Sequence, residues 1–109
     1  MKLVLMVVDG SDVDRLSDEL VQAGHSVTRV GSSGGFLRRR STTILSGVED
    51  DAVDDVVAIV RRLSSARTEW APVHGLPFLA EATAPDEMLE VRRGGAVIWV
   101  LPVEHFERL

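Results

Sequence analysis

Residues 2–20 read KLVLMVVDGSDVDRLSDEL, and residues 42–60 read TTILSGVEDDAVDDVVAIV. In each stretch, apolar residues typical of a buried strand are followed by acidic turn residues and then by apolar residues at helical spacing. The two stretches align at an offset of forty residues, with Leu5 on Leu45 and Val13 on Val53. This internal similarity is weak, but it suggests two right-handed βαβ units that interleave in one sheet. The predicted fold class is therefore α+β, the ferredoxin-like βαββαβ arrangement with an antiparallel sheet and both helices on one face.

The rest of the chain fits the same plan. We expect strands at 2–8, 25–30, 42–48 and 96–103, and the strongly apolar first and last strands are predicted to be central. Glycine, serine and arginine residues at 31–41 indicate a loop, and residues 64–86, where periodicity is absent, indicate a second, long loop. Residues 88–92 are expected to form a short strand that turns at 93–95 into the last strand as a hairpin. The prediction is a single domain, 1–109, with the two loops as insertions.

Composition excludes several classes of protein. The chain has 109 residues, a formal net charge of −5 and no cysteine. The small size leaves room for one core, so a large ligand is expected on a surface or between subunits. Without cysteine there are no disulfides, thiol catalysis or cysteine-ligated metals. The negative charge argues against a nucleic acid partner. No stretch reaches the roughly 18 apolar residues that span a bilayer, so no membrane contact is expected and a cytoplasmic location fits best.

A sheet covered by helices on one face leaves its other face open. In the last strand, Ile98 and Trp99 point to opposite faces, so one large apolar side chain lies on the side away from the helices. Such a face is stable in water only when another subunit covers it. We therefore expect an oligomer.

Catalysis and metal binding have little support in the sequence. No histidine lies at a spacing that would activate a serine, so we expect no enzyme. The three histidines are widely separated, and the acidic residues at 49–55 are explained by their place at a helix start, where carboxylates stabilise the helix dipole. No metal and no cofactor are predicted. An enzyme that grips a phosphorylated metabolite with residues 38–40 is the weakest of the alternatives, because an acid, base or nucleophile is missing nearby.

The most informative segment is 28–43, which reads TRVGSSGGFLRRRSTT. Glycines let backbone amides converge on an anion, hydroxyl groups offer hydrogen bonds, arginines supply positive charge, and Phe36 offers a stacking platform. These residue types point to a nucleotide or another phosphorylated aromatic ligand. From the residues alone, a flexible loop with Phe36 tucked into the core is an equally good interpretation.

Three motifs carry a resemblance to a known family. They are SGGFLR at 33–38 with Thr42 and Thr43, GVED at 47–50, and GGAVIWVLPVEHF at 94–106. The sequence resembles the PII-like cyclic di-AMP receptor family of bacteria over nearly its whole length. The resemblance implies a PII-like homotrimer with equivalent ligand sites in the clefts between subunits. It also implies a non-enzymatic, nucleotide-sensing signal transduction protein whose loops change order on binding and act on an unknown downstream protein.

The resemblance also assigns roles to single positions. Thr28 would hydrogen-bond phosphate or base, Gly47 would allow close approach, and Trp99 would either complete a pocket of the neighbouring subunit or fill the interface. The segment that would line the adenine pocket consists of Gly35, Phe36 and Leu37. Ser41 replaces an asparagine of the family, and Ser26 replaces a common arginine. The candidates for phosphate contact are Arg38, Arg39 and Arg40.

Because Ser41 and Ser26 depart from the family pattern, ligands other than cyclic di-AMP remain alternatives. Ser41 offers only part of the hydrogen bonding of an asparagine amide, and an arginine at 39 or 40 would reach phosphate from a different direction than one at 26. Cyclic di-AMP is the leading ligand. The alternatives are a divergent PII-like trimer that binds another nucleotide, or one that acts only as a protein-interaction module.

Overall fold

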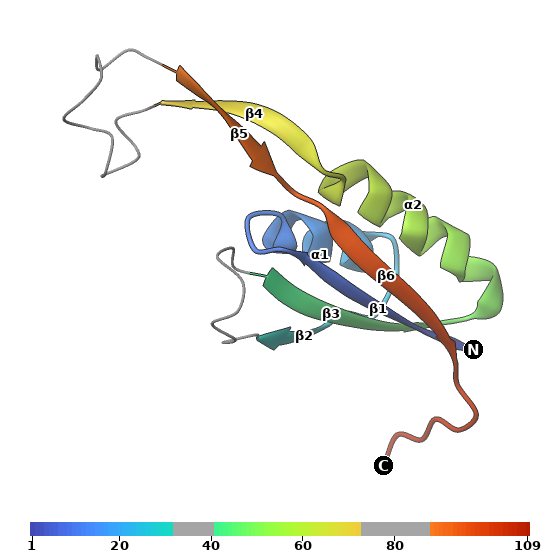
Figure 1. The fold of residues 1–109 in the computed structure, drawn as a ribbon. Helices are drawn as coiled ribbons and strands as arrows, with labels where there is room; N and C mark the ends of the chain where they lie inside the picture. The colour runs from blue at the N-terminus through green and yellow to red at the C-terminus, as the bar shows by residue number, and fades with distance from the viewer. Residues whose placement is uncertain (32–40, 73–87) are drawn as a thin grey trace.

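The computed structural model describes residues 1–31, 41–72 and 88–109. In chain order, the elements are β1 (Lys2–Asp9), α1 (Val13–Gln22), β2 (Thr28–Gly31), β3 (Ser41–Val48), the short 3-10 helix η1 (Asp50–Ala52), α2 (Val53–Ser64), β4 (Arg67–Pro72), β5 (Met88–Arg93) and β6 (Ala96–Pro102). In this part of the chain, β2, β3, β1 and β6 form one antiparallel sheet in that order (Figure 1). This order, with a helix after β1 and another after β3, confirms the predicted α+β, ferredoxin-like fold.

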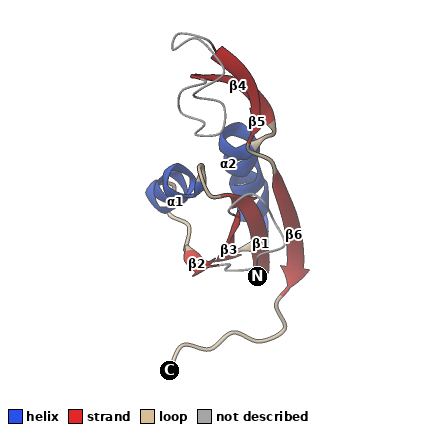
Figure 2. Ribbon diagram, turned by 60° about the vertical axis from the view of Figure 1, so that its left-hand side comes forward, coloured by secondary structure: helices blue, strands red, loops and turns tan. Residues whose placement is uncertain are grey.

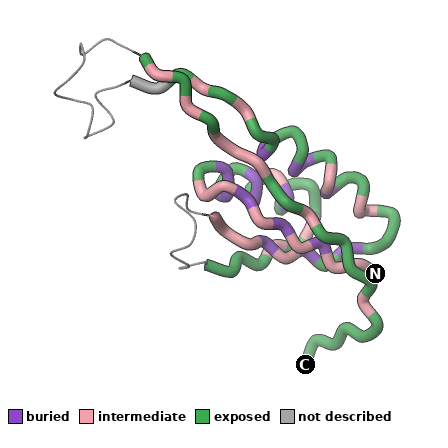
Figure 3. The backbone as a smooth tube through the Cα atoms, in the orientation of Figure 1, coloured by how far each residue is buried: buried purple, intermediate pink, exposed green. Residues whose placement is uncertain are grey.

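The hydrophobic core lies between the helices and one face of the sheet (Figure 2). Side chains alternate along β1, where Val4, Met6 and Val8 are buried and the residues between them are half-buried (Figure 3). This is the two-residue period of a strand. The helices contribute the apolar stripes that their spacing predicts: Leu16 and Leu20 from α1, and Val56, Val60 and Leu63 from α2.

The opposite face of the sheet carries apolar side chains without a covering layer among the described residues. Trp99 pairs with Leu5, Leu5 with Leu45, and Leu45 with Thr28, so these four residues form one row across the sheet. Residues directly opposite each other in antiparallel strands share a face. Ile98 packs against the core, whereas Trp99 is 48% exposed, as expected from strand alternation.

β6 corrects one prediction. It is an edge strand, not a central one. Its apolar character comes from the uncovered sheet face, where Val97, Trp99 and Leu101 are exposed, and not from burial between two strands.

The segment predicted as a long loop at 64–86 is partly wrong as well. Residues 67–72 form β4, which pairs with β5 in a two-stranded antiparallel ribbon that projects beyond the body (Figure 1). Residues 73–87 lie outside the described residues, as do 32–40 of the other predicted loop. β5 also does not form a hairpin with β6. Gly94 and Gly95, both with positive φ, lead instead from the ribbon into the sheet, where β6 pairs with β1.

Contacts at the base of the ribbon fix it to the body. The guanidinium of Arg67 donates to both carboxylate oxygens of Asp12 at 2.7 and 3.2 Å, and Asp12 is only 7% exposed. The amide of Gly94 donates to the Asp9 carboxylate at 3.0 Å. Hydrogen bonds from Arg67 to Asp12 and Glu69 raise the pKa of Arg67 above its ordinary value, so this group stays charged. The start of α1 therefore holds the ribbon.

Candidate functional site

Of the four predicted site residues that the structure describes, the fold brings two together and separates the other two from them. Thr28 and Gly47 line the same pocket on the uncovered sheet face. Trp99 lies in the cross-strand row of Thr28 but does not line that pocket. Ser41 is at the opposite end of β3 from Gly47, paired with Asp9. The remaining predicted residues lie outside the described residues: Gly35, Phe36, Leu37, Arg38, Arg39 and Arg40.

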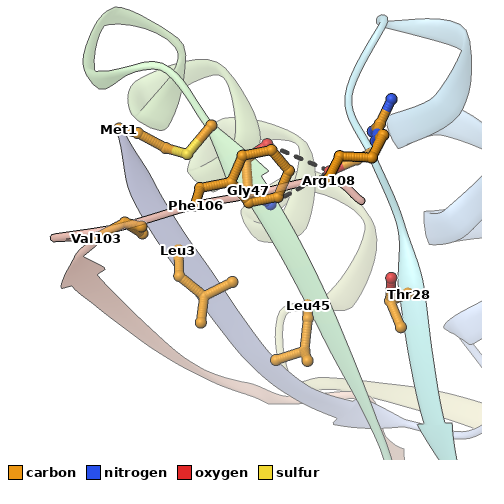
Figure 4. Close-up of a pocket in the computed structure, with 9 residues that line it drawn as sticks. Met1, Leu3, Thr28, Leu45, Gly47, Val103, Phe106 and Arg108 are labelled. Carbon is orange, nitrogen blue, oxygen red and sulfur yellow. Dashed lines mark hydrogen bonds between the residues drawn. The ribbon is translucent and has the colours of Figure 1, made fainter.

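The pocket that contains Thr28 and Gly47 is open and has a volume of about 520 Å³. Its floor is the sheet, with Leu3 from β1 and Leu45 from β3, and the chain after β6 crosses it (Figure 4). The residues that line it are Met1, Leu3, Ser26, Thr28, Leu45, Gly47, Val103, Phe106 and Arg108. Apolar walls with a few polar groups are typical of small-molecule sites.

Phe106 gives the pocket an aromatic surface. Phe106 and Gly47 both line the pocket, and Phe106 is 61% exposed. A Cβ built on Gly47 would meet nothing within 4 Å, so packing does not require glycine there. The open space at Gly47 therefore belongs to the pocket.

A pair of hydrogen bonds fixes the polar edge of the pocket. The hydroxyl of Ser26 donates to the carbonyl of Gly47 and accepts from its amide, both at 3.2 Å. Ser26 lies two residues before the start of β2. There its side chain, and not a strand backbone, hydrogen bonds to Gly47.

Ion pairs hold the strand that carries Thr28. Arg29 binds the Asp14 carboxylate at 2.8 Å and the Ser17 hydroxyl at 3.1 Å, which ties β2 to α1. His25 contacts the Asp55 carboxylate at 2.6 Å, which ties the residues before β2 to α2. The backbone on both sides of Thr28 is therefore anchored to the helices.

Sequence reasoning missed the contribution of the chain after β6. Phe106 and Arg108 line the pocket, although nothing in their spacing connects them to Thr28 or Gly47. Phe106 ends the family motif at 94–106 and Arg108 follows it, but without the fold these signals do not say where the segment lies. The sequence marks Ser26 only as a position where an arginine is common in the family.

Three further observations concern metal binding, membrane helices and the charge near the N-terminus. Among the described residues, no cluster of three or more His, Asp or Glu side chains is arranged to hold a metal ion. In the same part of the chain, the helices are too short or too polar to cross a membrane. The amino group of Met1 lies 2.9 Å from the Asp50 carboxylate and lowers the pKa of that group by hydrogen bonding and charge.

The strand order, the helices on one face and the open pocket on the other define a ferredoxin-like α+β domain with an uncovered sheet face. The model of the family described as "Cyclic-di-AMP receptor" matches residues 1–109. The chain therefore belongs to the cyclic di-AMP receptor family, as its sequence motifs predict. This is a receptor family, which supports a role in nucleotide-sensing signalling.

A solved structure has the same fold. It is that of a functionally unknown protein from Pediococcus pentosaceus ATCC 25745, which is 32% identical in sequence. The two chains superpose with a TM-score of 0.79, over 99% of this chain and 96% of the other. The similarity extends over almost the whole length of both chains.

Proposed function

We propose that this chain is a non-enzymatic, PII-like signal transduction protein that binds cyclic di-AMP in the clefts between the subunits of a homotrimer. The observation that carries the proposal is the pocket at Thr28, Gly47 and Phe106, in a chain of the cyclic di-AMP receptor family. The pocket offers each chemical group that a nucleotide needs. Its apolar floor and the Phe106 ring suit a base, and the Arg108 guanidinium and Thr28 hydroxyl suit a phosphate.

The uncovered sheet face supports assembly. Val97, Trp99 and Leu101 are each more than two-fifths exposed, and half-buried Leu3 and Leu5 continue the same apolar surface. Contiguous apolar surface of this kind marks interfaces, because its contact with water is unfavourable. The pocket opens on this face and is not enclosed by its own chain. A neighbouring subunit that covers the face would close the pocket.

The predicted residues at 35–41 are proposed to complete the site. Gly35, Phe36 and Leu37 are proposed to line the adenine pocket, and Arg38, Arg39 and Arg40 are proposed to contact phosphate. Ser41, at the opposite end of β3 from Gly47, is proposed to reach the ligand from a neighbouring subunit. Trp99 is proposed to contact the neighbouring subunit. These assignments rest on the family motif.

Calorimetric titration with cyclic di-AMP tests the ligand, with ATP and cyclic di-GMP as controls. We expect binding of one cyclic di-AMP per chain and much weaker binding of the controls. Sedimentation equilibrium tests assembly, and the expected mass is about three times the 11.9 kDa of the chain. The absence of heat with cyclic di-AMP at high protein concentration would refute the ligand, and a monomer would refute the assembly.

One observation favours a second function, binding of a downstream protein by the ribbon. Trp70 on β4 is 66% exposed and Met88 on β5 is 48% exposed, and the two lie on the same face of the ribbon. Exposed aromatic residues are enriched in protein interfaces. Phe36→Ala discriminates the two functions, because it should abolish nucleotide binding and leave binding of a protein at the ribbon unchanged.

A further inference from the structure

The contact between Ser26 and Gly47 has a consequence for ligand recognition. The β2–β3 register pairs Thr28 with Leu45, so its continuation places residue 26 opposite Gly47. The Ser26 hydroxyl, and not a strand backbone, binds the amide and the carbonyl of Gly47 there. Both polar groups of the Gly47 backbone are therefore occupied within the chain.

These two groups have the pattern that recognises adenine. Adenine presents a donor, the N6 amine, next to an acceptor, N1, whereas hypoxanthine presents an acceptor, O6, next to a donor, N1–H. A backbone carbonyl can accept a hydrogen bond from N6 of adenine while the adjacent N–H donates to N1. With hypoxanthine, the carbonyl would face the acceptor O6 or the N–H would face the donor N1–H, so the pattern does not match. If the Gly47 amide and carbonyl were free, the pocket would distinguish the two bases.

Ser26 is held in place from the chain on either side. His25, whose side chain is only 10% exposed, contacts Asp55 at 2.6 Å, and Arg29 is bound to Asp14 and Ser17 on α1. A second open pocket, of about 340 Å³, shares Met1, Ser26 and Gly47 with the first one. The Ser26–Gly47 contact therefore borders both pockets, and a ligand in either pocket can reach it.

We infer that Ser26 is a specificity-determining residue. Its hydroxyl occupies the Gly47 amide and carbonyl, which would otherwise hydrogen bond to the edge of a purine base. The inference rests on the proposed nucleotide function. In the chain as it stands, the base is held by stacking on Phe106 and by phosphate contacts, which adenine and hypoxanthine nucleotides share. The pocket thus accepts cyclic purine dinucleotides with little discrimination between these two bases.

Calorimetric titration of the full chain with cyclic di-AMP and cyclic di-IMP tests this inference. For the wild type, we expect dissociation constants within about 3-fold of each other, because the Gly47 amide and carbonyl are bound to Ser26 and do not distinguish the bases. For Ser26→Ala, which exposes the Gly47 amide and carbonyl, we expect a preference for cyclic di-AMP of about 10-fold, the effect of a gained pair of hydrogen bonds. Ser26→Thr keeps the hydroxyl and should keep the wild-type ratio.

The amide resonance of Gly47 provides a second readout. In ¹H–¹⁵N spectra, this amide should exchange faster with solvent in Ser26→Ala than in the wild type, while the dispersion of the other resonances shows that the variant is folded. Cyclic di-AMP should then shift the Gly47 resonance strongly in Ser26→Ala and weakly in the wild type. Equal ratios in the wild type and Ser26→Ala, or a wild type that already prefers adenine about 10-fold, would overturn the role of Ser26. If neither protein binds either dinucleotide, the proposed function itself is refuted, and this inference with it.

Discussion

Gly94 is the position where a single methyl group should destabilise the fold most sharply. Its φ of +78° lies in the left-handed region, where a side chain costs about 1–2 kcal/mol. A Cβ would also lie 2.6 Å from the carbonyl oxygen of Ser65 and 2.5 Å from Nη1 of Arg67. The first contact is with backbone and cannot be relieved by a rotamer change. The second contact displaces the Arg67 guanidinium that binds Asp12, a residue that is only 7% exposed.

These effects together predict that Gly94→Ala lowers the free energy of unfolding by about 3 kcal/mol, the sum of backbone strain and a weakened hydrogen bond to a charged group. For a chain of 109 residues this corresponds to a fall in Tm of about 10–15 °C. Urea denaturation followed by circular dichroism measures the first quantity, and thermal denaturation measures the second. Both are compared at one protein concentration, because assembly shifts apparent stability.

Two other glycines are matched controls. Gly24 has a φ of +91° but open space around its Cβ position, so Gly24→Ala should cost only the backbone strain, about 1 kcal/mol. Gly47 has neither a positive φ nor a close neighbour, so Gly47→Ala should change stability by less than about 0.5 kcal/mol. The reasoning is refuted if Gly94→Ala is as stable as the wild type, or if Gly47→Ala is destabilised as strongly as Gly94→Ala.

The remaining predictions concern binding and assembly. Phe106→Ala should weaken cyclic di-AMP binding by about 5- to 100-fold in calorimetry, because stacking of one base contributes about 1–3 kcal/mol; an unchanged Kd would remove Phe106 from the site. Arg108→Gln should weaken binding and reduce its salt dependence, as measured by titrations at several salt concentrations, since one phosphate contact is lost. Trp99→Glu places a charge on the apolar sheet face and should convert the proposed trimer to monomers in sedimentation velocity, whereas Val21→Glu, at an exposed position of α1, should leave the mass unchanged.

The body of the fold could be predicted from the sequence because its elements have clear periodicity. β1 shows the continuous apolar run of a buried strand and α2 the helical spacing of an apolar stripe, and their positions agree with the structure within a few residues. The family motifs identified the same fold independently. Local patterns and the overall fold therefore point to the same answer in this part of the chain.

The ribbon and the place of β6 could not be read from local patterns. β4 pairs with β5 across residues 73–87, and charged residues occur on both faces of the ribbon, such as Glu69 of β4 on one and Arg92 of β5 on the other, so no apolar stripe marks it. β6 is apolar on both faces, which is normally a sign of a central strand. In this chain one of those faces belongs to a surface that its own helices do not cover.

The candidate site was half predictable. Thr28 and Gly47 were named from the family motif, and the sheet register brings them to one pocket. Phe106 and Arg108 were not named, because the course of the chain after β6 depends on tertiary structure. The role of Ser26 depends on a side-chain contact with Gly47 that no spacing rule describes.

The central claim is that a nucleotide binds the pocket bounded by Thr28, Gly47 and Phe106. Its most direct test is the set of ¹H–¹⁵N chemical-shift changes that cyclic di-AMP causes in the labelled protein. The changes should be largest at these three residues and at Leu3 and Arg108, with little effect along the exposed side of α2. The claim is contradicted if the pocket residues do not respond at saturating ligand, or if the changes lie on the helices instead.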